Sequence, residues 1–161
     1  MPDQASVDSS SSAITGFNAV CHGRQTERDV LLVHVLTDVG DGWGECVAGS
    51  APVYSAEWVD GAEAVIRDYL APALLAEEIV EAWDVARVTK FVVGHRMAKA
   101  ALEMAVLDAQ LRSTGQSFAS YFGATRTEVD CGVSVGIAAS IPELLDEVRG
   151  YVDAGYKRIK L

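Results

Sequence analysis

Cysteine is scarce in this sequence, and its spacing excludes the common uses of paired thiols. The three cysteines, Cys21, Cys46 and Cys131, are odd in number and far apart. No Cys-x-x-Cys spacing occurs, which argues against a zinc knuckle or a redox-active dithiol. We therefore expect each cysteine to be a small buried hydrophobic residue in a reducing compartment.

Basic residues are also few. The chain of 161 residues holds 13 Lys and Arg against 23 Asp and Glu, which gives a formal net charge of −10. This balance opposes binding to nucleic acid or to an anionic membrane, because phosphate groups would be repelled. The sequence also lacks a basic segment followed by an apolar one at its start, and any apolar run long enough to span a bilayer. We expect a cytoplasmic protein with no nucleic-acid or membrane partner.

The remaining composition is that of a globular protein, with 50% hydrophobic and 22% charged residues. Residues 1–16 are an exception, because they are rich in small polar residues and include four consecutive serines. We expect this segment to be disordered. The rest of the chain divides by pattern into an α+β region over 17–123 and the beginning of an α/β region over 124–161.

The first region should contain a hairpin followed by helices. Residues 29–47 hold two strand-like runs around the turn sequence Asp-Val-Gly-Asp-Gly. Helices are predicted from Ser55, with Pro72 interrupting or restarting the first, and then over 81–93 and 96–114. The last of these is apolar on nearly every side, so it should be buried, and its alanines would let neighbouring backbones approach closely.

The second region predicts a strand, a helix and another strand. The strands are expected over 129–137 and 156–161, and the helix over 141–154. Ser140 and Glu143 have capping-box spacing, with Pro142 in the first turn. Short connections make this a βαβ unit with parallel strands. One helix and two parallel strands leave sheet edges uncovered, so we expect this unit to be the start of a larger domain.

Several polar residues could serve either structure or function. Ser134, in an alternating strand, could contact a substrate amide or carboxylate, or be a core serine; His22 could reach a substrate, or be a solvated loop residue. A structural role is favoured for five other residues: packing or capping for the histidines, a hairpin anchor for the first glutamate, and ion pairs for the two acidic residues of the long helix. The i,i+4 pairs on that helix are Lys99–Glu103 and Asp108–Arg112. These others are His34, Glu45, His95, Glu103 and Asp108.

Six stretches distributed along the chain form one recognisable pattern. They are ERDVLLV (27–33), GWGEC (42–46), GHRMAKAALEMA (94–105), LDA (107–109), CGVSVG (131–136) and GYKRIKL (155–161). Together they resemble the N-terminal part of enolase-superfamily enzymes of the muconate-lactonizing type, in the N-acylamino acid racemase / o-succinylbenzoate synthase branch. The resemblance covers roughly residues 23–161. The helix over 98–109 is a specific feature of it, whereas the GWGE turn alone would be weak.

The resemblance implies a fold and a chemistry. The fold class is an α+β capping domain, an antiparallel meander plus helices, followed by the first βαβ unit of an incomplete (β/α) barrel. In that family a Lys-x-Lys pair on the second barrel strand supplies a base, and a lysine on the sixth strand faces it. Carboxylates on later strands hold Mg²⁺, which stabilises the enediolate formed by removing a proton α to a carboxylate.

Lys160 matches the first lysine of the pair, a like charge beside the base, while Ser134 and His22 are the candidate substrate contacts. The second lysine would be residue 162, after the last residue, Leu161, and the metal ligands would follow it. The resemblance therefore implies Mg²⁺, a small carboxylate substrate and a homo-oligomer for a longer parent, and no metal or turnover for this fragment.

Two departures and several alternatives remain. Residues 1–16 do not resemble the family's first strand, and residues 17–22, where a loop should close over the substrate, lack the expected arginine. The chain could also be a non-catalytic capping or oligomerisation module, or belong to a dipeptide epimerase or muconate cycloisomerase lineage. The sequence does not separate racemase from o-succinylbenzoate synthase.

Overall fold

A computed structural model describes residues 4–13, 19–20, 23–24, 27–78 and 80–161, with side chains from residue 28 onward. The chain forms two compact units. The first combines Met1–Ser12 with Arg28–Gly123, and the second combines Ala13–Glu27 with Ala124–Leu161. The division after Gly123 falls where the sequence pattern changes. The grouping of Ala13–Glu27 with the second unit is not predicted by the sequence.

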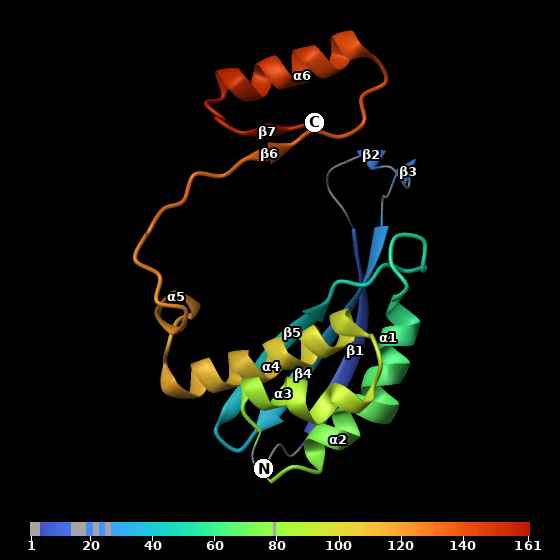
Figure 1. Ribbon diagram of the computed structural model, residues 1–161, viewed down its shortest axis with the longest axis vertical. Coiled ribbons are helices and arrows are strands. Elements are labelled where there is room, and N and C mark those ends of the chain that lie inside the picture. Colours follow the sequence, from blue (N-terminus) through green and yellow to red (C-terminus); the bar gives the residue numbers. More distant parts are fainter. Residues whose placement is uncertain (1–3, 14–18, 21–22, 25–26, 79) are drawn as a thin grey trace. The chain divides into compact units, whose positions relative to one another are not determined.

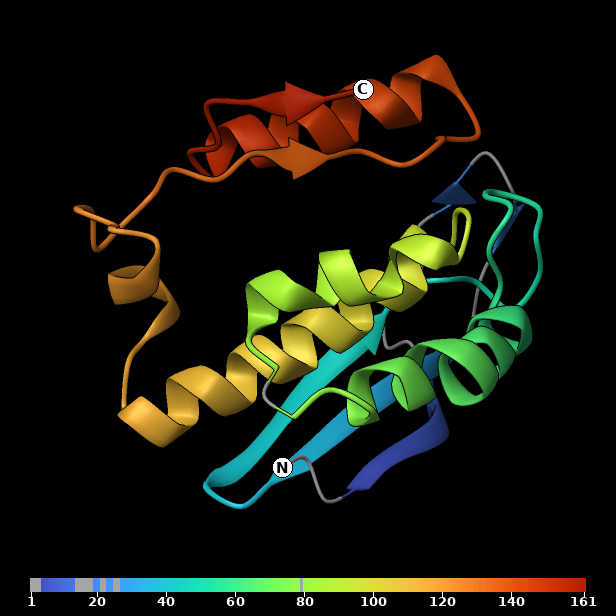
Figure 2. The ribbon, with the colours of Figure 1, turned by 60° about the horizontal axis from the view of Figure 1, so that its bottom comes forward.

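The first unit is built on a three-stranded sheet in the order β1 (Gln4–Ala13), β4 (Glu27–Thr37), β5 (Gly40–Cys46). Strands β4 and β5 are antiparallel, with Leu31 opposite Cys46 and Thr37 opposite Gly40, which confirms the predicted hairpin. The helices between residues 59 and 114 cover one face of the sheet (Figures 1 and 2). Two short strands, β2 (Ala19–Val20) and β3 (Gly23–Arg24), form a separate antiparallel pair.

Strand β1 corrects the expectation that residues 1–16 are disordered. Residues 4–13 form a strand at the edge of the sheet, hydrogen-bonded to β4. The serine-rich composition misled the prediction because it shows no apolar alternation. Backbone N–H and C=O groups of an existing strand can order such a segment without that alternation, and polar residues suit an edge. A strand therefore does precede residues 17–22, as the resemblance implies.

A nearly continuous helical segment follows the hairpin. It consists of α1 (Val59–Val65), a π-helical turn η1 (Ile66–Leu70) and α2 (Ala71–Leu75). Trp58, and not Ser55, is the N-cap of α1. Pro72 lies in the first turn of α2 and lacks an N–H, and just before it the Ala71 N–H reaches the Ile66 carbonyl. Pro72 was predicted to interrupt or restart this helix; it lies at the change from π-helical to α-helical geometry, and the helical conformation continues through it.

Further helical elements complete the first unit. They are α3 (Ala82–Val88), a 3-10 turn η2 (Thr89–Phe91), α4 (Arg96–Thr114) and the short α5 (Phe118–Tyr121). The bounds of α4 are those predicted, and Gly115, with φ of 64°, ends it in the left-handed conformation. No helix among the described residues is long and apolar enough to cross a membrane.

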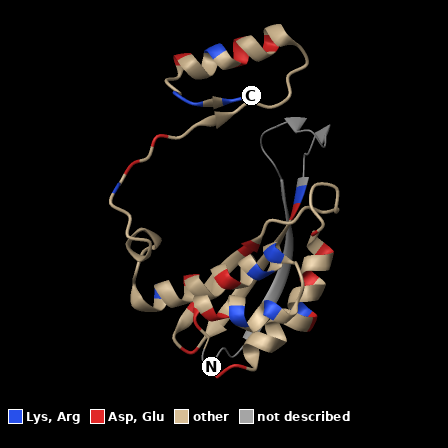
Figure 3. Cartoon of the chain, in the orientation of Figure 1, with Lys and Arg blue, Asp and Glu red and all other residues tan. Residues whose placement is uncertain are grey.

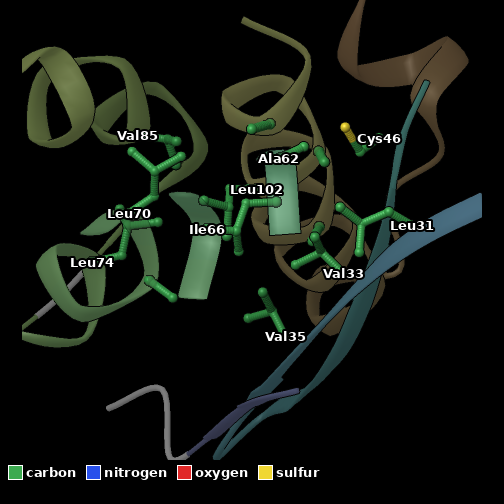
Figure 4. Close-up of a cluster of buried hydrophobic side chains, with 14 of the residues drawn as sticks. Leu31, Val33, Val35, Cys46, Ala62, Ile66, Leu70, Leu74, Val85 and Leu102 are labelled. Atoms are coloured by element: carbon green, nitrogen blue, oxygen red, sulfur yellow. The ribbon is translucent and has the colours of Figure 1, made fainter. Parts of the chain in front are cut away.

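Helix α4 lies directly on β5, as its alanines predicted. A Cβ added to Gly44 would overlap the Ala101 carbonyl oxygen, and one added to Gly42 would overlap the backbone of Ala105 and Ala109. Around this contact the larger buried side chains fill the space between sheet and helices (Figure 4), among them Leu31, Val33, Ile66, Leu70, Val85 and Leu102. Cys46 belongs to this core as expected, whereas Cys131 is exposed.

The second unit contains the predicted βαβ arrangement. Strands β6 (Val133–Ser134) and β7 (Ile159–Lys160) are parallel, and α6 (Ile141–Asp153) connects them. The Ser140 hydroxyl accepts the Glu143 N–H at 3.3 Å, and the Glu143 carboxylate accepts the Ala139 N–H at 3.1 Å. The strands are shorter than predicted because each has a single described neighbour to pair with.

The contact between β5 and α4 makes a stability prediction. Gly44→Ala should lower the free energy of unfolding by at least about 2 kcal/mol, because a methyl group must separate two backbones in contact. Gly49→Ala is the matched control, since the nearest atom to its Cβ would be 3.7 Å away. Urea unfolding followed by circular dichroism measures both. Equal midpoints for the two variants would contradict the close packing.

Candidate functional site

The structure brings two of the three predicted site residues together. Ser134 and Lys160 are register partners on β6 and β7, and both side chains are exposed. In a parallel pair, partners in register point to the same face, about 4.8 Å apart. The Val135 N–H donates to the Lys160 carbonyl at 2.9 Å, which fixes this register at the end of the ladder. A hydroxyl and an ammonium group therefore share one face.

The opposite face of the same ladder is apolar. Val133 and Ile159 alternate with the two polar residues and are half-buried. Helix α6 runs alongside the two strands in both views (Figures 1 and 2), with Leu144, Val148 and Tyr151 as its half-buried residues. Because burial against the helix selects the apolar face, Ser134 and Lys160 must point away from it.

Ser134 and Lys160 are also the last residues of their strands. The carboxyl ends of parallel strands meet at one edge, and this is the edge at which barrel enzymes carry their active sites. A hollow of about 250 Å³ lies elsewhere in this unit, lined by Asp130, Cys131 and residues 154–157, which precede the strands. That hollow does not include the predicted site residues.

The third predicted residue, His22, lies outside the described residues. The role of His22 stays a prediction.

The described residues do not provide a magnesium site. Nowhere in this part of the chain do three His, Cys, Asp or Glu side chains gather as potential ligands. Mg²⁺ requires several oxygen ligands, usually including carboxylates. The residues described therefore do not fit the metal that the fold family implies, and no chemical step is assigned to a metal on them.

The other polar residues singled out from the sequence have structural surroundings. Asp108 accepts the Trp43 N–H and the Arg112 Nε–H, both at 2.9 Å, so the predicted Asp108–Arg112 pair is confirmed. The predicted Lys99–Glu103 pair is wrong, because Lys99 donates to the Val92 carbonyl instead. The Val92 carbonyl oxygen, which follows η2, accepts the hydrogen bond of the ammonium group in place of the Glu103 carboxylate.

Sequence reasoning missed the group that caps α4. His95 occupies the N-cap position with φ of 47°, but its side chain makes no capping bond. The Glu57 carboxylate instead accepts the Met97 N–H at 2.9 Å and the Ala98 N–H at 3.3 Å. A carboxylate at a helix N-terminus compensates free N–H groups and the helix dipole. Glu57 precedes α1 by two residues, so local spacing gave no signal for this contact.

His34 has a structural environment on the hairpin. Its Nε2 lies 2.8 Å from Asp41 Oδ2, and its ring stacks on Trp43 with centroids 3.9 Å apart. The hydrogen bond from His34 is the main cause that holds the pKa of Asp41 below its ordinary value of 3.8. Glu45, at the other end of the hairpin, lies 3.6 Å from Arg28.

The lowered pKa of Asp41 makes a prediction about acid stability. A carboxyl group whose pKa is lower in the folded state stabilises the fold above the unfolded-state value of 3.8, and this contribution is lost as pH falls through the folded-state pKa. Asp41→Asn should therefore lower the urea midpoint at pH 6, and the difference from the parent chain should shrink at pH 3. Asp29→Asn, an exposed change on the same hairpin, serves as control. A difference that is independent of pH would contradict the assignment.

Comparison with known proteins places these observations in a family. Residues 7–123 match the mandelate racemase / muconate lactonizing enzyme N-terminal domain. N-succinylamino acid racemase from Amycolatopsis is 56% identical over 139 residues, which are 86% of this chain and 38% of that protein. o-Succinylbenzoate synthase from Enterococcus faecalis is 36% identical over 141 residues, 87% of this chain and 38% of that protein. The chain thus spans 38% of the length of these relatives.

Solved structures confirm the predicted fold class, a capping domain followed by the first βαβ unit of a barrel. An enolase-superfamily member from Listeria innocua superimposes with a TM-score of 0.89 at 29% identity, over 96% of this chain and 42% of that one. An unknown superfamily member from Enterococcus faecalis gives 0.87 at 30% identity, over 98% and 43%. With residues 7–123 matching its N-terminal domain, the chain belongs to the mandelate racemase / muconate lactonizing enzyme family of the enolase superfamily.

Proposed function

We propose that this chain supplies the capping domain and first barrel strands of a cytoplasmic, magnesium-dependent enzyme that removes the proton α to a carboxylate. The type we propose is N-acylamino acid racemase / o-succinylbenzoate synthase. The observation that carries the proposal is the placement of Lys160 beside Ser134 at the carboxyl edge of two parallel strands, in a chain 56% identical to an N-succinylamino acid racemase. Identity to muconate cycloisomerase 1 of Rhodococcus opacus is lower, at 33%.

Each of the two residues has a separate role in this proposal. The Lys160 ammonium group is a fixed positive charge beside the base and toward the substrate carboxylate, where it opposes the charge that develops on deprotonation. The Ser134 hydroxyl can donate a hydrogen bond to a carboxylate or amide oxygen of the same substrate. The base and the magnesium ligands are assigned to no described residue of this chain.

The names of the relatives guide the proposed substrate. N-succinylamino acid racemase and o-succinylbenzoate synthase both name a succinyl group. Compounds of these two kinds carry two carboxylates, so we propose a dicarboxylate substrate. We also propose that the assembled enzyme is a homo-oligomer, which sedimentation at several protein concentrations would test.

A second function is a non-catalytic capping or oligomerisation module. Two observations favour it for this chain by itself: the chain spans 38% of its relatives' length, and its described residues contain no cluster of metal-ligating side chains. The two functions are compatible. The assembled enzyme would carry out catalysis, and this chain would contribute its capping domain and first barrel strands.

The second function predicts that the chain alone is inactive. Purified chain with Mg²⁺ and N-succinylamino acids in D₂O should exchange the substrate α-proton no faster than the buffer, because no described residue is assigned as the base and no cluster of metal-ligating side chains occurs among the described residues. Proton NMR measures the exchange. Exchange above background would contradict this reading.

The catalytic role of Lys160 makes the complementary prediction. Residues 1–161 joined to the remaining length of the Amycolatopsis relative should racemise N-succinylamino acids. In that chimera Lys160→Ala should lower kcat/KM by at least about 100-fold, the size expected for loss of one group that stabilises developing charge.

Lys157→Ala is the matched control, because Lys157 lies before strand β7 and its ammonium group is 3.9 Å from Asp130. It removes the same charge and should leave kcat/KM nearly unchanged. An active chimera that tolerates Lys160→Ala as well as Lys157→Ala would overturn the role.

A further inference from the structure

Arg158 lies directly before β7 and presents its side chain to the face that carries Lys160. The Val133 N–H donates to the Arg158 carbonyl at 3.0 Å, so the pairing of β6 with β7 extends to this residue. Residues two positions apart along a strand point the same way and lie about 6.6 Å apart. Arg158 is exposed, as Lys160 is. The guanidinium group is thus a second cation on this face, one layer farther from the carboxyl edge.

The contact with Gly132 fixes the direction of the arginine side chain. A Cβ added to Gly132 would be 2.7 Å from Arg158 Nε and 3.3 Å from Nη2. Gly132 precedes Ser134 by two residues, so its missing Cβ belongs to the face of Ser134 and Lys160. The guanidinium group therefore lies across the ladder, in space that a larger residue at position 132 would occupy.

The Arg158 guanidinium group has no counter-ion in the described part of the chain. Among the residues whose side chains are described, no carboxylate oxygen lies within 4.0 Å of it, whereas Arg149 on α6 lies 2.7 Å from Asp146. Residues 155–161 hold three Lys or Arg and no acidic residue, and basic residues mark this stretch in Figure 3. Helix α6 packs against the opposite face, with Tyr151 as its one titratable half-buried residue. An anion for Arg158 must therefore come from outside this unit.

The family fold places Arg158 where an unpaired charge is costly. Because α6 packs on the other side of β6 and β7, the face of Arg158 is directed to the interior of the barrel that these strands begin. Barrel interiors are filled by layers of side chains and form a packed core below the active-site edge. A guanidinium group enclosed there requires an anion within hydrogen-bonding distance. Its neighbours Gly132, Ser134 and Lys160 supply none.

We propose that Arg158 forms an ion pair with an aspartate or glutamate of a later barrel strand, one layer below the active-site edge, and that this pair positions Lys160. The inference rests on the proposed function for the barrel and for the role of Lys160. While the pair is intact, the carboxylate is neutralised and the Lys160 ammonium group extends toward the substrate. Without the arginine, the same carboxylate attracts that ammonium group away from the substrate. Arg158 is a positioning residue, because it acts through Lys160.

The pair predicts that Arg158 is reactive in this chain and protected in the chimera with the Amycolatopsis relative. Phenylglyoxal modifies accessible guanidinium groups, and mass spectrometry of peptides measures the rate at each arginine. In the chain alone Arg158 should react about as fast as Arg149, since both are exposed. In the chimera its rate should fall at least about tenfold, because a paired and enclosed group is withheld from the reagent. Arg149 should keep its rate and serves as control. Equal rates for Arg158 in the two proteins would overturn the pair.

Variants of the chimera test the positioning role. Arg158→Met should lower kcat/KM at least about tenfold and move its acidic limb to higher pH, because an unneutralised carboxylate favours the protonated form of the base beside Lys160. Arg158→Lys keeps the charge and should keep most of the activity and the pH profile. Arg149→Met, the matched control on α6, should change neither.

A purely structural role for Arg158 would lower the amount of active enzyme and leave the pH profile in place. An unmoved acidic limb in Arg158→Met, or a loss in Arg158→Lys as large as in Arg158→Met, would overturn the positioning role. Should Arg158→Met fail to fold, the modification rates and the pH profile of Arg158→Lys still decide the outcome.

Failure of this inference is distinguishable from failure of the proposed function, because modification is measured without turnover. Protection of Arg158 in a folded but inactive chimera would reject the proposed enzyme and keep the pair. An active, Lys160-dependent chimera in which Arg158 reacts as fast as in the chain alone would reject the pair and keep the enzyme.

Discussion

The first unit depends on one contact, the approach of the β5 backbone to the α4 backbone. Gly42 and Gly44 on the strand face Ala101, Ala105 and Ala109 on the helix, with no side chain between them. Such an approach brings the strand and helix nearer than ordinary side-chain packing would. The larger residues of the core, from Leu31 to Leu102, then fill the space that remains on either side. The positions of sheet and helices follow from this contact.

Much of this arrangement could be predicted from local pattern. The bounds of α4, the hairpin of β4 and β5, and the parallel β6 and β7 all follow from periodicity, turn residues and capping residues. Contacts between distant residues could not. The Glu57 carboxylate caps a helix that begins about 40 residues later, and β1 becomes a strand because β4 offers it hydrogen-bonding groups. Tertiary context decides such features, and propensity alone does not.

The candidate site also combines features that the sequence predicted with features that only the structure shows. The sequence placed Ser134 in an alternating strand and Lys160 in the strand that follows the helix, but only the register shows that they are partners. Arg158 gave no signal in the sequence beyond its charge. The contact of its side chain with Gly132 on the neighbouring strand joins residues 26 apart, a spacing set by the length of the helix and its two connections. His22, predicted from its place in a loop, lies outside the described residues.

The bond between the Trp43 N–H and the Asp108 carboxylate has a consequence for association between molecules. Strand β5 ends the sheet, so amide groups along its outer side could pair with a strand of another chain. At Trp43 this donor is already occupied by a side chain of α4, and Arg112 holds the same carboxylate in place. An incoming strand would have to displace the Asp108 carboxylate near the middle of the outer edge of β5. The helix that supports the sheet thus also limits its growth into a larger aggregate.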